Sequence, residues 1–133
     1  MILGTGIDLV DSRRIEKLME KHSERFIDRY FTEKEQELIK ERKKSGQDIM
    51  TLAKRFAAKE ACAKALGTGF IDGLQLRDIE VFSDDFGKPY IALSGKADEL
   101  VQAMLPKGSE SLIHLSLTDE VPYAQAQVII ESI

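Results

Sequence analysis

The strongest constraint on the fold of this chain is a segment that predicts one long helix, from about Asp48 to Leu66, with Gly67 as its C-terminal stop. Phe56, Glu60 and Lys64 are four residues apart in this segment, so they lie close together on one helical face. An aromatic ring, an acid and a base on one stripe are costly to bury unless they bind something charged. We therefore expect this face to form part of a binding site.

A second acid, Asp8, lies in an N-terminal segment, residues 2–10, that predicts a strand. The side chains of this strand alternate between a face of larger residues and a face of glycines: Leu3, Thr5, Ile7 and Leu9 against Gly4, Gly6 and Asp8. Because the two glycines clear space beside Asp8, we expect this face to be open to a ligand.

Asp8 and Glu60 form an acid pair with basic neighbours, which suggests a divalent metal that holds phosphates. Mg²⁺ prefers octahedral oxygen ligands and usually keeps waters, so one or two carboxylates plus substrate phosphates suffice. By spacing alone a second interpretation stays open, in which Glu60 pairs with Lys64 along the helix and Asp8 only ends a strand. The Gly67-Thr68-Gly69 segment also has two interpretations: its backbone approaches a ligand closely, or it is a plain helix end followed by a turn.

The remaining segments alternate between helical and extended patterns, and no repeat or linker divides them. Helices are expected from Asp11 or Ser12 onward, around residues 25–30, over 33–42 behind the capping box Thr32-x-x-Glu35, and from Ser94 to Pro106. Strands are expected over 78–82, 89–93, 112–118 and 123–130, the last two pairing with each other. This order predicts an α+β fold, a single domain over residues 1–133 with an antiparallel sheet packed against helices.

Composition excludes several classes of protein. The chain of 133 residues is 43% hydrophobic and 32% charged, which is typical of one ordinary globular domain. It has no apolar run near the ~20 residues that span a membrane and no signal peptide, and its single cysteine cannot form an internal disulfide. We therefore expect a cytoplasmic protein without membrane association. The net charge of −4 argues against a general nucleic-acid binder.

Polar and basic residues are concentrated in three segments. Seven basic residues lie between Lys40 and Lys59 against two acids, and six lie between Arg13 and Arg29 against four acids. These are either solvated helix faces or a local basic surface for an acidic partner or a polyphosphate. In the strand expected over 112–118, the polar row is either the wet face of an antiparallel strand or part of a site: His114, Ser116 and Thr118.

In combination, these segments resemble the motifs of the small, bacterial-type holo-[acyl-carrier-protein] synthases, a class of 4′-phosphopantetheinyl transferases. The resemblance covers essentially the whole chain. It is carried by Gly6-Ile7-Asp8, by Arg55-Phe56-Ala57-Ala58-Lys59-Glu60-Ala61-x-x-Lys64-Ala65-x-Gly67-Thr68-Gly69, by Gly87-Lys88-Pro89, by His114-x-Ser116-x-Thr118-Asp119 and by the closing stretch Tyr123–Glu131. The helix motif is the most specific of these.

The resemblance implies a role for each matching residue. Asp8 and Glu60 would hold Mg²⁺ against the pyrophosphate of coenzyme A, with Lys64 on phosphate as the third catalytic residue. Glu60, directly or through a metal-bound water, is the candidate base for the incoming serine. Val10 stands where the larger two-lobed transferases carry another acid, so a water would complete the metal shell. Coenzyme A would be bound by Arg55, Phe56, Lys64, Gly67, Lys88 and Pro89, and by His114, Ser116 and Thr118 from a neighbouring subunit.

The resemblance also implies a reaction and its partners. The 4′-phosphopantetheine of coenzyme A would move to a serine of apo-acyl carrier protein, releasing adenosine 3′,5′-bisphosphate and supporting fatty acid biosynthesis. Because the carrier is acidic and helical in this family, it is expected to dock on the first helix, at Arg14 with Arg13, Arg25 and Arg29 in support. A homotrimer with active sites between subunits is expected.

Two other functions make different predictions for the same residues. A carrier-binding module that has lost catalysis would have a broken set of Asp8, Glu60 and Lys64, and all three are present. An unrelated metal-dependent phosphohydrolase would show more convergent acids or a histidine cluster, and the sequence has neither pattern. The sequence therefore favours a Mg²⁺-dependent transferase that uses coenzyme A.

Overall fold

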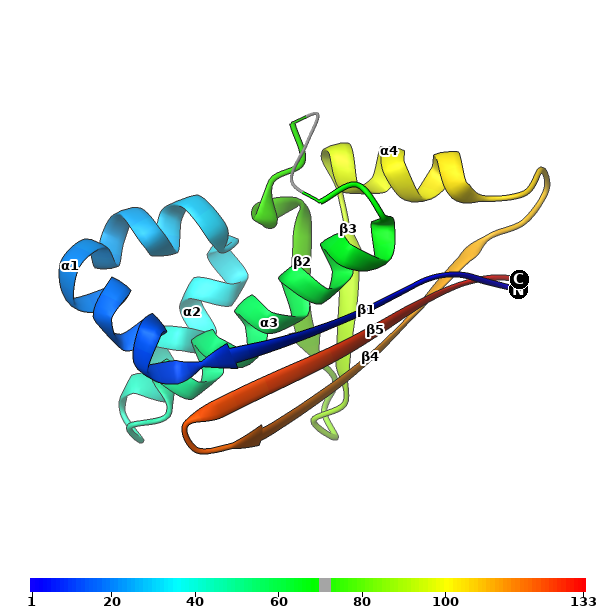
Figure 1. The fold of residues 1–133 in the computed structure, drawn as a ribbon. Helices are drawn as coiled ribbons and strands as arrows, with labels where there is room; N and C mark the ends of the chain where they lie inside the picture. The colour runs from blue at the N-terminus through cyan, green and yellow to red at the C-terminus, as the bar shows by residue number, and fades with distance from the viewer. Residues whose placement is uncertain (70–72) are drawn as a thin grey trace.

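The computed structural model describes residues 1–69 and 73–133, and it shows helices packed against antiparallel strands (Figure 1). The elements in chain order are β1 (Ile2–Asp11), α1 (Ser12–Tyr30), α2 (Glu33–Lys43), α3 (Asp48–Leu66), a 3₁₀ turn η1 (Leu76–Asp78), β2 (Ile79–Ser83), β3 (Pro89–Leu93), α4 (Gly95–Met104), β4 (Ser111–Glu120) and β5 (Tyr123–Ser132). The expected α+β class is confirmed, and so are the bounds of α3 and β3.

The strands form two antiparallel units. The first is a three-stranded sheet of order β1-β5-β4, in which the C-terminal strand β5 is central and the N-terminal strand β1 is at one edge. The second is the β2-β3 hairpin. In Figure 1 both termini lie at the same end of the long sheet. The expected pairing of the last two strands is confirmed, with His114 opposite Ile129 and Ser116 opposite Gln127.

Helix α3 covers one face of the long sheet and forms the centre of the core. Its alanines favour the helix and are small enough for close packing, and those of β5 face them across the interface. The buried residues of this interface include Ala57, Ala61 and Ala65 of α3 and Ala124, Ala126, Val128 and Ile130 of β5.

The glycine face of β1 is not open to a ligand, which corrects the expectation from the sequence. A Cβ atom on Gly4 would overlap the carbonyl oxygen of Ala65, and one on Gly6 would overlap that of Ala61. The glycines are therefore needed because the backbone of α3 lies directly on β1. The same packing turns Asp8, on the same face of β1, toward α3.

Helix α1 agrees with the two helical pieces that the sequence predicted, because the backbone of His22 is non-helical (φ −142°, ψ 36°) and separates two helical segments. It runs from Ser12 to Tyr30 with a kink at His22, and Asp11 caps it by accepting a hydrogen bond from the Arg13 N–H. Its last turn belongs to an aromatic cluster in which Phe26 contacts Tyr30, Phe31 and Phe56. This cluster fixes the end of α1 beside the middle of α3.

Several local signals in the sequence are confirmed. Thr32 and Glu35 form the capping box that begins α2. Gly67 ends α3 with a φ of 82°, a left-handed conformation that glycine adopts without strain. Within the described residues, no helix is both long and apolar enough to cross a bilayer.

Candidate functional site

Asp8 and Lys64 meet where β1 crosses the C-terminal half of α3. Lys64 Nζ lies 3.2 Å from Asp8 Oδ1 and also donates a hydrogen bond to the main-chain carbonyl of Ile7 at 2.8 Å. Asp8 is mostly shielded, whereas the Lys64 side chain is 54% exposed. Lys64 therefore pairs with the strand, and its ammonium group remains accessible to a ligand.

Glu60 lies one helical turn before Lys64 and is half-buried. Burial raises the pKa of the Glu60 carboxyl, and the nearby charge of Asp8 raises it further, while Lys64 partly opposes both. A divalent cation bound between two carboxylates removes the repulsion between their negative charges. The oxygen donors of Asp8 and Glu60 thus fit Mg²⁺.

The described part of the chain adds no third His, Cys, Asp or Glu ligand to this pair. Among the described residues, no group of three or more His, Cys, Asp and Glu side chains comes together. Since Mg²⁺ is commonly bound by one or two carboxylates with waters and substrate phosphates, the pair is sufficient in number. At the position of a third acid in the larger transferases, Val10 is buried in the core.

A cavity of about 590 Å³ lies beside Glu60. It is lined by Phe56 and Glu60 of α3, by the end of α1 and by the segment Leu74–Arg77. The lining residues from α1 are Asp28, Arg29 and Tyr30. No motif in the sequence indicated the segment Leu74–Arg77.

A second cavity, of about 420 Å³, lies between α2, α3 and the β2-β3 hairpin. Three basic residues, two acids and two hairpin residues are among those that line it: Arg42, Lys54 and Arg55, Asp84 and Asp85, and Gly87 and Pro89. Arg55 is 6% exposed, and its Nε atom has no hydrogen-bond partner within the described part of the chain. Burial lowers the pKa of Arg55, as expected for a guanidinium whose charge has lost its hydration. A phosphate group would supply the missing acceptor.

The basic surface expected between Lys40 and Lys59 is therefore only partly present. Arg55 and Lys59 are buried, and the Lys59 side chain is fully shielded from solvent. Lys59 therefore belongs to neither a solvated helix face nor a basic surface, whereas Arg55 is buried but lines the second cavity. Arg42 and Lys54 are lining residues that the sequence indicated only through this local density of positive charge.

Comparison with known proteins agrees with this geometry. Residues 4–116 match the model of the 4′-phosphopantetheinyl transferase superfamily. The chain belongs to this family. It is 52% identical over 133 residues to the holo-[acyl-carrier-protein] synthase of Brucella ovis, covering 100% of this chain and 97% of that protein. The resemblance stated from the sequence is thus confirmed.

Solved structures of relatives share the fold of this transferase. The holo-[acyl-carrier-protein] synthase of Neisseria meningitidis has a TM-score of 0.82 at 36% identity, over 98% of this chain and 99% of that one. The enzyme of Bacillus anthracis, solved in complex with CoA (3′,5′-ADP), has a TM-score of 0.78 at 37% identity, over 100% and 99%. The Helicobacter pylori enzyme, solved in complex with coenzyme A, has a TM-score of 0.79 at 28% identity, over 96% and 99%.

The remaining residues assigned to coenzyme A lie in three places on the transferase. Gly67 ends α3 just beyond Lys64, and Lys88 and Pro89 lie at the β2-β3 hairpin, where Lys88 Nζ sits 5.4 Å from the centre of the Tyr90 ring. The polar row of β4 is on the other face of the long sheet from Asp8: His114, Ser116 and Thr118. The structure does not bring this row to the Asp8–Glu60 site of the same chain.

The four arginines assigned to carrier docking all lie on α1. Arg14 and Arg25 are exposed, and Arg29 lines the cavity beside Glu60. Arg13 instead forms a close pair with Asp11, 2.6 Å between Nη2 and Oδ2, and its hydrogen bonds lower the pKa of Asp11 to about 2. Arg14 is thus less engaged within its own chain than Arg13.

Proposed function

We propose that this protein transfers the 4′-phosphopantetheine of coenzyme A to a serine of apo-acyl carrier protein, giving holo-acyl carrier protein and adenosine 3′,5′-bisphosphate for fatty acid biosynthesis. The observation that carries this proposal is the meeting of Asp8, Glu60 and Lys64 where β1 crosses α3, beside a cavity. The names of the Brucella and Neisseria relatives, and the coenzyme A bound in two related structures, support it.

Asp8 and Glu60 are the residues that would hold Mg²⁺. When bound, the metal supplies positive charge that stabilises the phosphate oxygens and the leaving group in phosphoryl transfer. Lys64 adds a mobile positive charge next to the same carboxylates, suited to the developing charge on the departing phosphate. Glu60, directly or through a metal-bound water, is the proposed base for the attacking serine.

The basic cavity between α2, α3 and the β2-β3 hairpin is the proposed site for the phosphorylated nucleotide end of coenzyme A. Among the residues that the structure describes, none accepts a hydrogen bond from Arg55 Nε, and Arg42 and Lys54 add positive charge that Asp84 and Asp85 offset in part. Phe56, Gly67, Lys88 and Pro89 are proposed to complete the binding surface. His114, Ser116 and Thr118 reach the ligand in this proposal only if a second subunit supplies them, since they lie on the far face of the sheet.

The transferase is therefore proposed to act as a homotrimer with each site between two subunits, in the cytoplasm. The acidic carrier is proposed to dock on α1, with Arg14 as the central contact and Arg13, Arg25 and Arg29 around it. Acids alternate with these arginines along the helix, so the attraction is modest and docking should weaken with added salt.

Intact-mass spectrometry of apo-acyl carrier protein tests the proposed function. The carrier is incubated with this protein, coenzyme A and Mg²⁺, with and without EDTA. The expected result is a gain of one phosphopantetheine that EDTA abolishes. If the folded protein modifies none of several classes of carrier but, when immobilised on a column, still binds them, it would instead be a binding module. Breakdown of coenzyme A without modification of the carrier would indicate a phosphohydrolase.

A further inference from the structure

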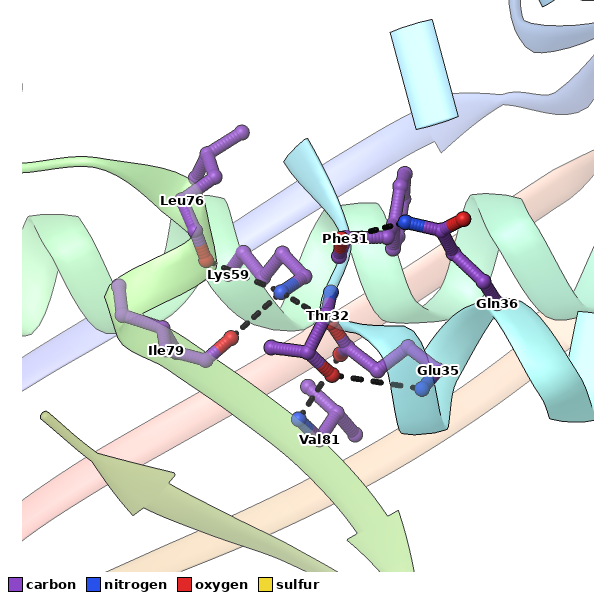
Figure 2. Close-up of polar contacts among 8 residues, drawn as sticks. All are labelled: Phe31, Thr32, Glu35, Gln36, Lys59, Leu76, Ile79 and Val81. Atoms are coloured by element: carbon purple, nitrogen blue, oxygen red, sulfur yellow. Dashed lines mark hydrogen bonds and ion pairs between the residues drawn. The ribbon is translucent and has the colours of Figure 1, made fainter. Parts of the chain in front are cut away.

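Lys59 and Glu35 form an ion pair in the interior, at the residue that immediately precedes Glu60 on α3 (Figure 2). Lys59 Nζ and Glu35 Oε1 lie 2.7 Å apart, and both side chains are fully shielded from solvent. Lys59 Nζ also donates hydrogen bonds to the main-chain carbonyls of Leu76, at 3.0 Å, and of Ile79. An ammonium group has three hydrogens to donate, so Lys59 uses all of them.

Glu35 connects the pair to two more elements. Its Oε1 accepts a hydrogen bond from the Thr32 N–H at 2.9 Å, and its Oε2 accepts one from the Val81 N–H at 2.9 Å. Figure 2 shows the two side chains at the junction of α2, α3 and the strand that follows η1. One ion pair thus ties the beginning of α2, η1 and β2 to a single point on α3.

Stability alone is a weak explanation for this arrangement. Removing two charges from water is costly, and apolar residues of similar volume often replace a buried ion pair without loss of stability. Apolar side chains cannot replace the directional hydrogen bonds of the pair, because each of these bonds fixes the position of the carbonyl or N–H group that it joins. The pair therefore specifies where η1 and β2 lie relative to α3.

The position of η1 matters because it forms a wall of the cavity beside Glu60. Leu74, Gln75, Leu76 and Arg77 line that cavity together with Phe56 and Glu60. Lys59 donates a hydrogen bond to the carbonyl of Leu76, and it adjoins Glu60 in the chain. One side chain thus connects the Leu74–Arg77 wall to the part of α3 that carries Glu60.

We propose that Lys59 and Glu35 are positioning residues for the transfer reaction, which set the distance between the Leu74–Arg77 wall and the Phe56–Glu60 face of the cavity. This inference rests on the proposed function. Neither residue touches the reacting groups. Their effect is to keep the cavity at the width in which bound donor and Glu60 are aligned, and a displacement of about 1 Å is enough to slow an aligned reaction by ~100-fold.

Three variants separate positioning from stability: Lys59→Met, Glu35→Gln and the double variant Glu35→Gln/Lys59→Met. Lys59→Met leaves a buried carboxylate without its partner and is expected to be the least stable. The double variant removes both charges at similar volume, so its midpoint in denaturant should return toward that of the wild type. The control is Lys96→Met, which removes the exposed Lys96–Glu99 pair of α4, 3.7 Å apart.

The readouts are kcat, the KM for coenzyme A and the KM for apo-carrier, measured on folded protein, with denaturant midpoints alongside. We expect the double variant to be folded with kcat lowered ~10-fold or more, because the wall is no longer held. The KM for the carrier, which docks on α1, should stay unchanged. Lys96→Met should match the wild type in all readouts.

A double variant with wild-type kcat would overturn the proposal. So would Lys59→Met if its loss of activity were explained entirely by the smaller fraction of protein that is folded. Should the double variant not fold, Glu35→Gln decides, because it keeps the shape of the side chain but turns an N–H donor toward either Lys59 or the Val81 N–H and so breaks one of those hydrogen bonds. Unchanged kcat in folded Glu35→Gln would then overturn the proposal. A wild-type protein that transfers nothing would overturn the proposed function itself, and the positioning role with it.

Discussion

Lys59 and Lys64 lie on the same helix, and their surroundings give them opposite physical roles. Lys64 is about half exposed and shares its charge between Asp8 and the carbonyl of Ile7, so a phosphate can still approach it. Lys59 has all its donors fixed and no contact with solvent. One lysine is therefore suited to bind a ligand and the other to hold the protein around it.

Replacing Glu60 by glutamine tests the proposed base and metal ligand. Glu60→Gln keeps the size of the side chain but removes its charge and basicity, so the fold should persist while kcat falls ~100-fold or more. The measurement is the rate of carrier modification by intact mass at saturating Mg²⁺, with a thermal melt to verify folding. Glu99→Gln on α4 is the matched control and should behave as the wild type. Unchanged turnover in Glu60→Gln would remove Glu60 from both roles.

The spacing of Phe56, Glu60 and Lys64 and the motif around Asp8 singled out Asp8 and Lys64, which form an ion pair in the structure. Lys59 could not be predicted in the same way. Its partner Glu35 lies 24 residues earlier, and its other acceptors are backbone carbonyls that belong to any residue type. A buried charge is determined by tertiary contacts that helical periodicity does not encode.

At the scale of elements, the crossing of α3 over β1 determines the geometry of the site. Asp8 comes from the strand, and Glu60 and Lys64 come from the helix, so their separation depends on how closely the two elements pack. The sequence predicted both elements with nearly correct bounds. It did not predict their contact, because glycines on a strand face indicate equally an open ligand site or a close approach of backbone.

Replacing Gly6 by alanine tests this close approach. The added Cβ would overlap the carbonyl oxygen of Ala61, and a helix backbone cannot yield as a flexible side chain can. We expect Gly6→Ala to lower the free energy of unfolding by about 3 kcal/mol, the upper part of the usual range for overpacking. Denaturant titration measures this change. Lys17→Ala, at an exposed position of α1, is the control, and a Gly6→Ala variant as stable as Lys17→Ala would contradict the packing argument.

Helix α1 carries the proposed docking surface, and reversing one charge there tests it. Arg14→Glu should raise the KM for apo-acyl carrier protein about tenfold, because an attraction to an acidic partner becomes a repulsion. The KM for coenzyme A should stay the same. Lys107→Glu makes the same change of net charge in the segment before β4 and should leave both constants unaltered. An effect of Arg14→Glu confined to coenzyme A would exclude the docking role.

At the scale of the whole molecule, the long sheet has α3 on one face and apolar side chains exposed on the other. Ile7 is 54% exposed and Leu9 is 61% exposed, both on the face that β1 shares with His114, Ser116 and Thr118 of β4. A sheet face exposed to water is normally polar. Further copies of the chain would cover this face and carry its polar row to a neighbour's site, which is the proposed trimer.

Subunit mixing tests whether one site takes residues from two chains. Glu60→Gln and His114→Ala should each lower activity in a homotrimer, because every site then lacks one group. The two variants are co-expressed with different affinity tags, and trimers that carry both tags are purified. In a cyclic trimer of either mixed composition, one interface of the three joins an intact Glu60 to an intact His114, so about one third of the wild-type activity should return. Mixed trimers no more active than the average of the parents would show that Glu60 and His114 do not act across one interface. A protein that migrates as a monomer at working concentration, while fully active, would exclude the shared site altogether.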